Sequence, residues 1–182
     1  LSFSMPSFYL ALILILVFSV NLELFPIAGL HSVPNDGSLN YYLDFLWHLI
    51  MPIFVIVFAG IGSLTLYVRS LVIEILKSDY IFFAKARGLS KKQILRYYIL
   101  PNLYPPVITL LGLSLPAIIG GSVILESIFS IDGMGLLFYK SALAHDYPVI
   151  MGILIIGAFL TLLGNILADL VLLKLNPNYN NE

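Results

Sequence analysis

Cysteine is absent from the 182-residue sequence, and charged side chains are scarce. Without cysteine, disulfides, thiol nucleophiles and thiolate metal sites are excluded. Only 10% of the residues are charged, whereas soluble domains carry about 25%. Hydrophobic residues make up 60% of the chain. This composition predicts an integral membrane protein.

The basic residues are unevenly distributed, although the formal net charge is only −1. Most of them lie between Leu76 and Pro101, in a stretch with apolar sequence on either side. Positive charge in short loops marks the cytoplasmic side of a membrane. We therefore expect a cytoplasmic loop here, and nucleic-acid binding is a poor explanation for the charge. Six of the nine lysine and arginine residues belong to this stretch: Lys77, Lys85, Arg87, Lys91, Lys92 and Arg96.

Four hydrophobic runs are candidates for membrane helices. The first is short, because a span needs about 20 residues, and the second contains Pro52, which membrane helices tolerate. The segments 21–44 and 126–148 contain a single basic residue, Lys140, so we expect them on the outer side and both chain ends on the cytoplasmic side. The predicted fold is an all-α, polytopic membrane helical bundle with four transmembrane helices, at about residues 8–22, 45–68, 106–125 and 149–173.

The basic loop, residues 76–101, is predicted to form two short helices with a hinge between them. The first can continue from the preceding span without a break up to Gly88, which favours the left-handed conformation that closes many helices. Ser90 and Gln93 have the spacing of a capping box, which starts a new helix. Pro101 is expected to end that second helix, because proline cannot donate the next helical hydrogen bond.

One face of the first loop helix is aromatic and small. Tyr80, Phe83, Ala84 and Arg87 follow one another at the spacing i, i+3, i+4, i+7, which places them on the same side. In a cytosolic protein, core packing is the usual explanation of such a face. Beside a membrane span, a docking surface is an equal alternative.

The loop contains three motifs in a fixed order: Asp79-Tyr80-Ile81, Ala84-Lys85-Ala86-Arg87-Gly88-Leu89-Ser90, and Leu100-Pro101-Asn102. This pattern resembles the cytoplasmic EAA loop of ABC importer permeases, and more narrowly that of the peptide and nickel importer branch. The branch usually carries a basic and a small hydroxyl residue where this chain has Phe82 and Phe83, so the effect of these aromatics on docking stays open. The resemblance implies coupling to an ATPase subunit through Asp79, Tyr80, Phe83, Ala84, Lys85, Ala86, Arg87, Gly88, Leu89, Ser90, Leu100 and Pro101.

The resemblance continues outside the loop and covers nearly the whole chain. Full subunits of the branch have six spans. Residues 1–182 are therefore expected to be a single transmembrane permease domain that contains spans three to six and lacks the N-terminal ones. The segments that resemble the branch are Ser4-Met5-Pro6-Ser7-Phe8, Glu126-Ser127-Ile128-Phe129, Gly133-Met134-Gly135, Asp146-Tyr147-Pro148 and Asn176-Pro177.

The resemblance implies a permease subunit of an ATP-driven importer in the inner membrane of a bacterium or archaeon. Its partners would be cytoplasmic ATPase subunits, a second permease subunit, an external solute-binding protein and the lipid bilayer, and it would need no cofactor. The sequence contains no nucleophile–base constellation and no glycine-rich phosphate loop, so we expect a separate polypeptide to hydrolyse ATP. The sequence does not choose between peptides, nickel and other small solutes as cargo.

Two other classes of protein remain alternatives. A secondary transporter or channel fragment could use the basic loop for regulation, but it would need ionisable residues at mid-membrane, where this sequence has few. An intramembrane enzyme would need a catalytic cluster facing a cavity, and the sequence offers none.

Small residues recur in the third and fourth hydrophobic runs at the spacing of close helix packing. Ala117 and Gly121 form a small-xxx-small pair near Gly112, and Gly164 has a similar setting in the fourth run. Structural packing is the first interpretation, and the wall of a solute pathway is the second. Asn165 is expected at depth, where it would form an interhelical hydrogen bond or contact substrate.

Histidines and acidic residues near the membrane segments have simpler interpretations. Glu126, His48 and Asp169 lie near the ends of hydrophobic runs, where they are expected to reach water. His31, His48 and His145 are scattered without the spacing of metal ligands. No metal site is therefore expected.

Overall fold

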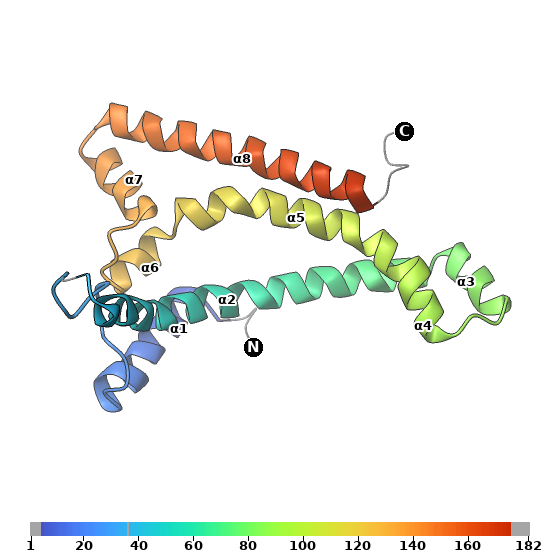
Figure 1. Ribbon diagram of the computed structural model, residues 1–182, viewed down its shortest axis with the longest axis horizontal. Helices are drawn as coiled ribbons and strands as arrows, with labels where there is room; N and C mark the ends of the chain where they lie inside the picture. The colour runs from blue at the N-terminus through green and yellow to red at the C-terminus, as the bar shows by residue number, and fades with distance from the viewer. Residues whose placement is uncertain (1–4, 36, 176–182) are drawn as a thin grey trace. The chain divides into compact units, whose positions relative to one another are not determined.

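The computed structural model describes residues 5–35 and 37–175, and within these ranges the chain forms helices and no strands (Figure 1). Of the segments that contributed to the resemblance, Ser4 and Asn176-Pro177 lie outside the described residues. The helices belong to two compact units, which are treated separately below.

Three helices are long and apolar enough to cross a membrane: α2 (Leu39–Leu76), the continuous helix Lys91–Ala117, and α8 (Tyr147–Leu175). The first predicted span corresponds to a shorter apolar helix, Ser7–Asn21. The prediction of an all-α membrane protein is confirmed. The number of four spans stays a prediction.

The first unit lies within Leu1–Ser63 and Gly120–Ile153. Its core forms where apolar faces of several helices meet, and it includes Ala11, Met51, Val55, Leu125 and Phe129. The Gly29 N–H donates to the Phe129 carbonyl at 2.7 Å, which ties the segment after the first helix to this core. The unit consists of α1 (Ser7–Leu14), the π-helix η1 (Ile15–Asn21), the first part of α2, α6 (Val123–Ile128), α7 (Met134–Leu143) and the start of α8.

The third predicted span is wrong at its C-terminal end. The helix α5 (Leu100–Gly120) stops at Gly120, and Gly121 adopts a φ of 65°, which ends the right-handed helix. Ser122 then caps α6 by accepting a hydrogen bond from the Leu125 N–H at 3.5 Å. Glycine is common inside membrane helices, so Gly121 within an apolar run did not indicate the end of the helix.

The second unit lies within Leu64–Ile119 and Leu154–Glu182. Figure 1 shows two short helices beyond the ends of α2 and α5. These are α3 (Asp79–Ala86) and α4 (Lys91–Ile94), and the π-helix η2 (Leu95–Ile99) joins α4 to α5. The predicted division of the basic loop into two short helices is confirmed.

Pro101 does not end the second loop helix, contrary to the sequence-based expectation. The chain remains helical from Lys91 to Ala117, and Pro101, Pro105 and Pro106 all lie inside helix. A proline ring clashes with the carbonyl four residues earlier, which is that of Tyr97, within η2. The wider turns of a π-helix accommodate this insertion, so the helix continues.

Candidate functional site: the basic loop of α3 and α4

The helix α2 ends at Leu76, the first residue of the basic loop, so the expected unbroken helix up to Gly88 is wrong. The Ser78 hydroxyl donates to the Ile75 carbonyl at 2.5 Å, and Ser78 has the extended backbone of a helix N-cap. Serine side chains compete in this way with the continuing helix. Asp79 then occupies the first turn of α3, where a negative charge stabilises the helix dipole.

Gly88 closes α3 in the left-handed conformation, as predicted, with a φ of 78°. The Leu89 N–H donates to the Ala84 carbonyl at 3.2 Å, and the Gly88 N–H donates to the Lys85 carbonyl at 2.9 Å. These two bonds form a Schellman motif. The motif reverses the chain within two residues, so the connection between the two loop helices is short.

The capping box that starts α4 is also confirmed. The Gln93 N–H donates to the Ser90 hydroxyl at 3.4 Å, and the Ser90 N–H donates to the Gln93 side-chain oxygen at 2.9 Å. Both ends of the turn therefore satisfy their own backbone groups.

A small aliphatic core fastens the loop to the helices that precede and follow it. Ile81 and Ala84 of α3 are 0% and 1% exposed. They pack with Ile94 and Ile99, and with Val72 and Ile75 of α2. Of the two interpretations of the aromatic and small face, core packing therefore holds for Ala84, because Ile81 and Ala84, three residues apart, form the inner side of α3.

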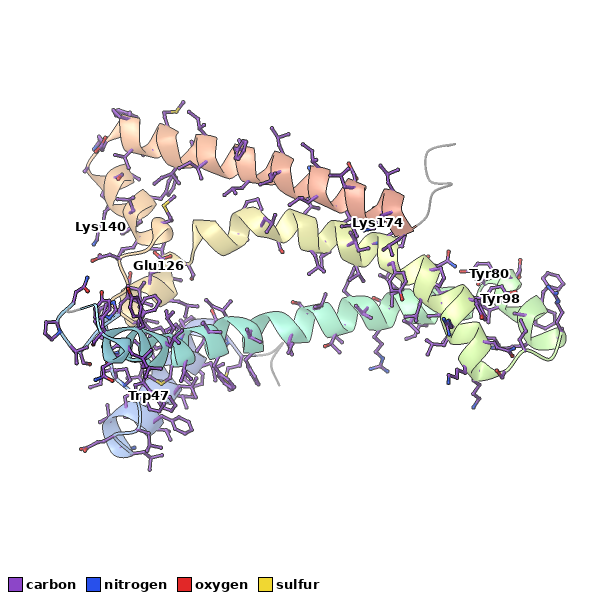
Figure 2. The ribbon with its side chains drawn as sticks, viewed as in Figure 1. Trp47, Tyr80, Tyr98, Glu126, Lys140 and Lys174 are labelled. Carbon is purple, nitrogen blue, oxygen red and sulfur yellow. The ribbon has the colours of Figure 1, made fainter. Side chains whose placement is uncertain are left out.

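The aromatic residues of α3 divide between the two sides of the helix. Tyr80 stacks on Tyr98, with ring centroids 6.4 Å apart and planes 16° from parallel (Figure 2). Phe82 and Phe83 point outward, 68% and 62% exposed, with their rings edge to face at 5.8 Å.

The outward surface combines this aromatic pair with positive charge. The side chains of Lys85, Arg87, Lys91, Lys92 and Arg96 are all exposed. Phe82 was not among the predicted coupling residues, and its exposure is the main feature of the surface that the periodicity missed. Of the predicted residues, Ala84 is buried, Leu89 and Leu100 are half-buried, and Asp79, Tyr80, Phe83, Lys85, Ala86, Arg87, Gly88, Ser90 and Pro101 are exposed.

The sequence of the chain matches one protein family over residues 1–181, and the family is described as the binding-protein-dependent transport system inner membrane component. The chain belongs to this family. Members of the family are helical membrane proteins, in agreement with the fold described above.

Curated relatives of this transport-system component are named as permease proteins. The chain described here is 41% identical over 174 residues to the oligopeptide transport system permease protein AppB of Bacillus subtilis (strain 168). The match covers 96% of this chain and 54% of that protein. The chain is 36% identical over 177 residues to the dipeptide transport system permease protein DppB of Lactococcus lactis subsp. cremoris (strain MG1363), covering 97% and 54%. It is 31% identical over 188 residues to the peptidoglycan transport system permease protein YejB of Agrobacterium fabrum (strain C58 / ATCC 33970), covering 100% and 51%. The chain spans about half the length of these relatives.

Helix packing in this transport-system component uses Gly112 and Gly164. A methyl group on Gly112 would lie 2.6 Å from the Gly164 carbonyl oxygen and 2.8 Å from the Ala168 Cβ, so only glycine permits this approach. Ala117 is exposed on α5, whereas Gly121 lies in the turn after it, so the two residues do not share a helix face. Their role in packing stays a prediction.

The interhelical hydrogen bond expected of Asn165 stays a prediction. Its side chain is exposed on α8, and it has no polar partner within the described part of the chain. Asp169 is likewise exposed.

Glu126 is buried, with 8% of its surface exposed, rather than reaching water as expected. Its carboxylate accepts hydrogen bonds from the N–H groups of Ser122 at 3.1 Å, Gly135 at 3.3 Å and Leu136 at 2.5 Å. Two of these donors belong to the first turn of α7, whose amides have no partner inside the helix. Glu126 therefore joins α6 to the positive end of α7 (Figure 2).

Two of the scattered histidines come together around Asp44. The His48 Nδ1 donates to the Asp44 main-chain carbonyl at 2.8 Å, and the His48 Nε2 lies 3.1 Å from the Ser32 hydroxyl oxygen. The His31 Nδ1 lies 3.9 Å from the Asp44 carboxylate. Among the residues that the structure describes, no three histidine or acidic side chains are arranged to hold a metal.

Proposed function

We propose that this chain is part of a permease subunit of an ATP-driven importer, and that its basic loop docks with a cytoplasmic ATPase subunit. The observation that carries the proposal is the construction of the loop. Ile81 and Ala84 hold α3 against the end of α2, while Phe82 and Phe83 are left exposed. Exposed aromatic patches of this kind are typical of interaction surfaces.

The charges around the aromatic pair favour a partner of complementary chemistry. Lys85 and Arg87 follow the pair on α3, and Lys91 and Lys92 lie on α4. An ATPase surface with an apolar recess and an acidic rim would bury the rings and face the cations. The basic loop would lie on the cytoplasmic side, because positive charge concentrates there.

The mechanism follows from the stiffness of the loop. ATP binding would close the ATPase dimer and displace α3. The Schellman motif at Gly88 and the capping box at Ser90 keep the turn short, and the aliphatic core passes the displacement to α2 and η2. The membrane helices would then open the solute pathway, and hydrolysis would reset it.

The remaining partners are proposed on the same basis. An external solute-binding protein would contact the outer segments, 21–44 and 126–148, and a second permease subunit would complete the pathway. Ala117 and Asn165, which are exposed on their helices, are candidates for facing that second subunit. The gene products named for oligopeptides and dipeptides among the relatives favour peptides over nickel as cargo.

A cross-linking experiment tests the docking proposal. Ala86 is exposed at the end of α3, and Ala28 is exposed on the proposed outer segment. Each is replaced by a single cysteine in the full-length subunit, and a thiol-to-amine cross-linker is applied to native membranes. Ala86→Cys should give an adduct that mass spectrometry identifies as an ATPase subunit. Ala28→Cys, the matched control, should react with an impermeant thiol reagent from outside the cell.

Two outcomes would contradict the proposal. If Ala86→Cys reacted only with a reagent applied outside, the orientation of the chain would be reversed. If Ala86→Cys were accessible from the cytoplasm but formed no ATPase adduct, a secondary transporter would become the better explanation.

A further inference from the structure

His31 and Asp44 face each other within the first unit, His31 from the segment 22–35 and Asp44 from the second turn of α2. The Ser32 N–H donates to the Asp44 carboxylate at 2.6 Å, which attaches this part of the segment to α2. The His31 Nδ1 lies 3.9 Å from the same carboxylate, which is too long for a hydrogen bond. The two side chains are 25% and 17% exposed, so the pair is largely covered but not bonded.

The His31 ring is held in place by two aromatic residues that lie one turn apart on α2. It stacks on Tyr41, with ring centroids 3.9 Å apart and planes 8° from parallel. It also stacks on Phe45, at 5.3 Å and 23°. The faces of aromatic rings attract cations within about 6 Å. A positive charge on His31 would therefore be stabilised by these rings as well as by the Asp44 carboxylate.

The Nδ1 atom of His31 is buried and has no hydrogen-bond partner within the described residues. Buried polar atoms without a partner are rare in folded proteins and need an explanation. Neither neutral form of the ring provides one, because a protonated Nδ1 finds no acceptor and an unprotonated Nδ1 finds no donor. A charged ring does, since a shift of about 1 Å would bring its Nδ1–H to the Asp44 carboxylate at the length of a charge-assisted hydrogen bond.

His48 also contacts Asp44, but both of its ring nitrogens have partners. The Nδ1 donates to the Asp44 main-chain carbonyl at 2.8 Å, and the Nε2 lies 3.1 Å from the Ser32 hydroxyl oxygen. A further proton on His48 would therefore form no new hydrogen bond. In the described part of the chain, the titratable groups around His31 are Tyr41, Asp44 and His48, and Asp44 is the one charged group within ion-pair distance of it.

We propose that His31 and Asp44 form a pH-dependent ion pair that fixes the segment 22–35 to the start of α2. At acid pH the charged His31 ring donates from Nδ1 to the Asp44 carboxylate and reinforces the attachment at Ser32. The ion pair is lost as the pH rises through the range in which histidines lose their charge, about pH 5–8. The segment is therefore held more firmly at acid pH than at alkaline pH.

The side of the membrane on which pH acts rests on the proposed function. If residues 21–44 lie outside the cell, the ion pair responds to the external pH. Acid would then order a surface that the external solute-binding protein meets. Order in advance lowers the cost of binding, so the ion pair would adjust this contact to the acidity of the surroundings.

The mobility of a spin label measures the ion pair in the complete transporter. Val33 follows Ser32 and is 40% exposed, so Val33→Cys in an otherwise cysteine-free transporter carries the label next to the attachment. The pH is lowered from about 8 to about 5, across the range in which histidine gains its charge. The ratio of immobile to mobile label should rise about fivefold, the size expected of a partly exposed ion pair.

Two conservative variants remove the charges and keep the shapes of the side chains. His31→Gln cannot become charged, and Asp44→Asn can still accept from the Ser32 N–H. Each should match the wild type at alkaline pH, which shows that the segment is folded, and should lose the response to acid. A response that survives in His31→Gln would overturn the proposal, as would a wild type without a response.

His145→Asn is the matched control for histidine in general. His145 is exposed in the turn before α8 and has a φ of 56°, a backbone conformation that asparagine tolerates. This variant should respond to acid as the wild type does. If it lost the response as His31→Gln does, the ion pair with Asp44 would not be its cause.

Acidifying one side of sealed vesicles separates the ion pair from the proposed orientation. In vesicles with the outer side of the cell membrane outward, external acid alone should immobilise the label. If only internal acid did so, the ion pair would stand and the proposed orientation of the importer would fail. If Ala86→Cys cross-links to an ATPase while the label ignores acid on both sides, the importer function stands and the ion pair alone fails.

Discussion

Two pairs of short helices connect membrane helices in this chain, and they are stabilised by opposite means. The pair α3 and α4 is held by an aliphatic core around Ile81 and by caps made from its own backbone and Ser90. The pair α6 and α7 is held by one buried carboxylate, Glu126, which bonds to three backbone N–H groups. The lysine and arginine side chains of the first pair are exposed, whereas the carboxylate of the second pair is buried.

The glycines of the two pairs differ in the same way. Gly88 has nothing within 4 Å of the place where a Cβ would lie, so its role is purely conformational. Gly133 has ordinary backbone angles, but a Cβ would lie 2.5 Å from the Glu126 carboxyl carbon. The loop at Gly88 needs glycine only for its backbone conformation, so its surface stays free for a partner. The loop at Gly133 needs glycine because a side chain would collide with the buried Glu126, so this loop packs on a residue of its own chain.

The largest expected effect is on the buried carboxylate. Glu126→Ala removes the acceptor for three amides and should lower the free energy of unfolding by about 3 kcal/mol or more. Glu126→Gln keeps one acceptor oxygen and should lose less. Thermal unfolding of the purified subunit measures both. Equal stability of Glu126→Ala and wild type would show that the carboxylate does not hold α7.

The glycine comparison predicts an intermediate effect. Gly133→Ala forces a methyl group against Glu126 and should cost about 2–3 kcal/mol of stability. Gly88→Ala meets no atoms and should cost about 1 kcal/mol, the penalty of a left-handed backbone. The same unfolding measurement compares them, and a larger loss for Gly88→Ala would reverse the comparison.

The smallest effect on stability is expected at the aromatic pair. Phe82→Ala and Phe83→Ala remove exposed rings and should change the free energy of unfolding by less than about 0.5 kcal/mol. Their effect on docking should be large, at about 2 kcal/mol for an interface anchor, and co-purification with the ATPase measures it. Tyr97→Ala is the control, because Tyr97 is another exposed aromatic residue, with 65% of its surface accessible. If this variant lost as much docking as Phe82→Ala, the aromatic pair on α3 would not be the main contact with the ATPase.

Local sequence signals predicted the turns of the basic loop correctly. Gly88 and the Ser90–Gln93 pair each act through neighbouring backbone groups, so a few residues suffice to recognise them. Composition was also sufficient for the class of all-α membrane protein, because lipid leaves helices as one of few solutions.

Features that depend on distant residues could not be predicted in this way. Periodicity grouped Tyr80 with Ala84, but only the packing against Ile94 and Ile99 decides that Ala84 points inward. Small residues in α5 offered several packing pairs, and the position of Gly164 on α8 selects Gly112. The burial of Glu126 depends on the start of α7, nine and ten residues later.

The central claim is that the loop transmits force because its turn at Gly88 is short and stiff. The most direct measurement is the number of solute molecules imported per ATP hydrolysed by the reconstituted transporter carrying Gly88→Asp. A side chain at this left-handed position is strained and adds charge at the joint. The account predicts that this ratio collapses while membrane insertion stays normal. A ratio equal to that of the wild type would contradict the claim that Gly88 couples the ATPase to the membrane helices.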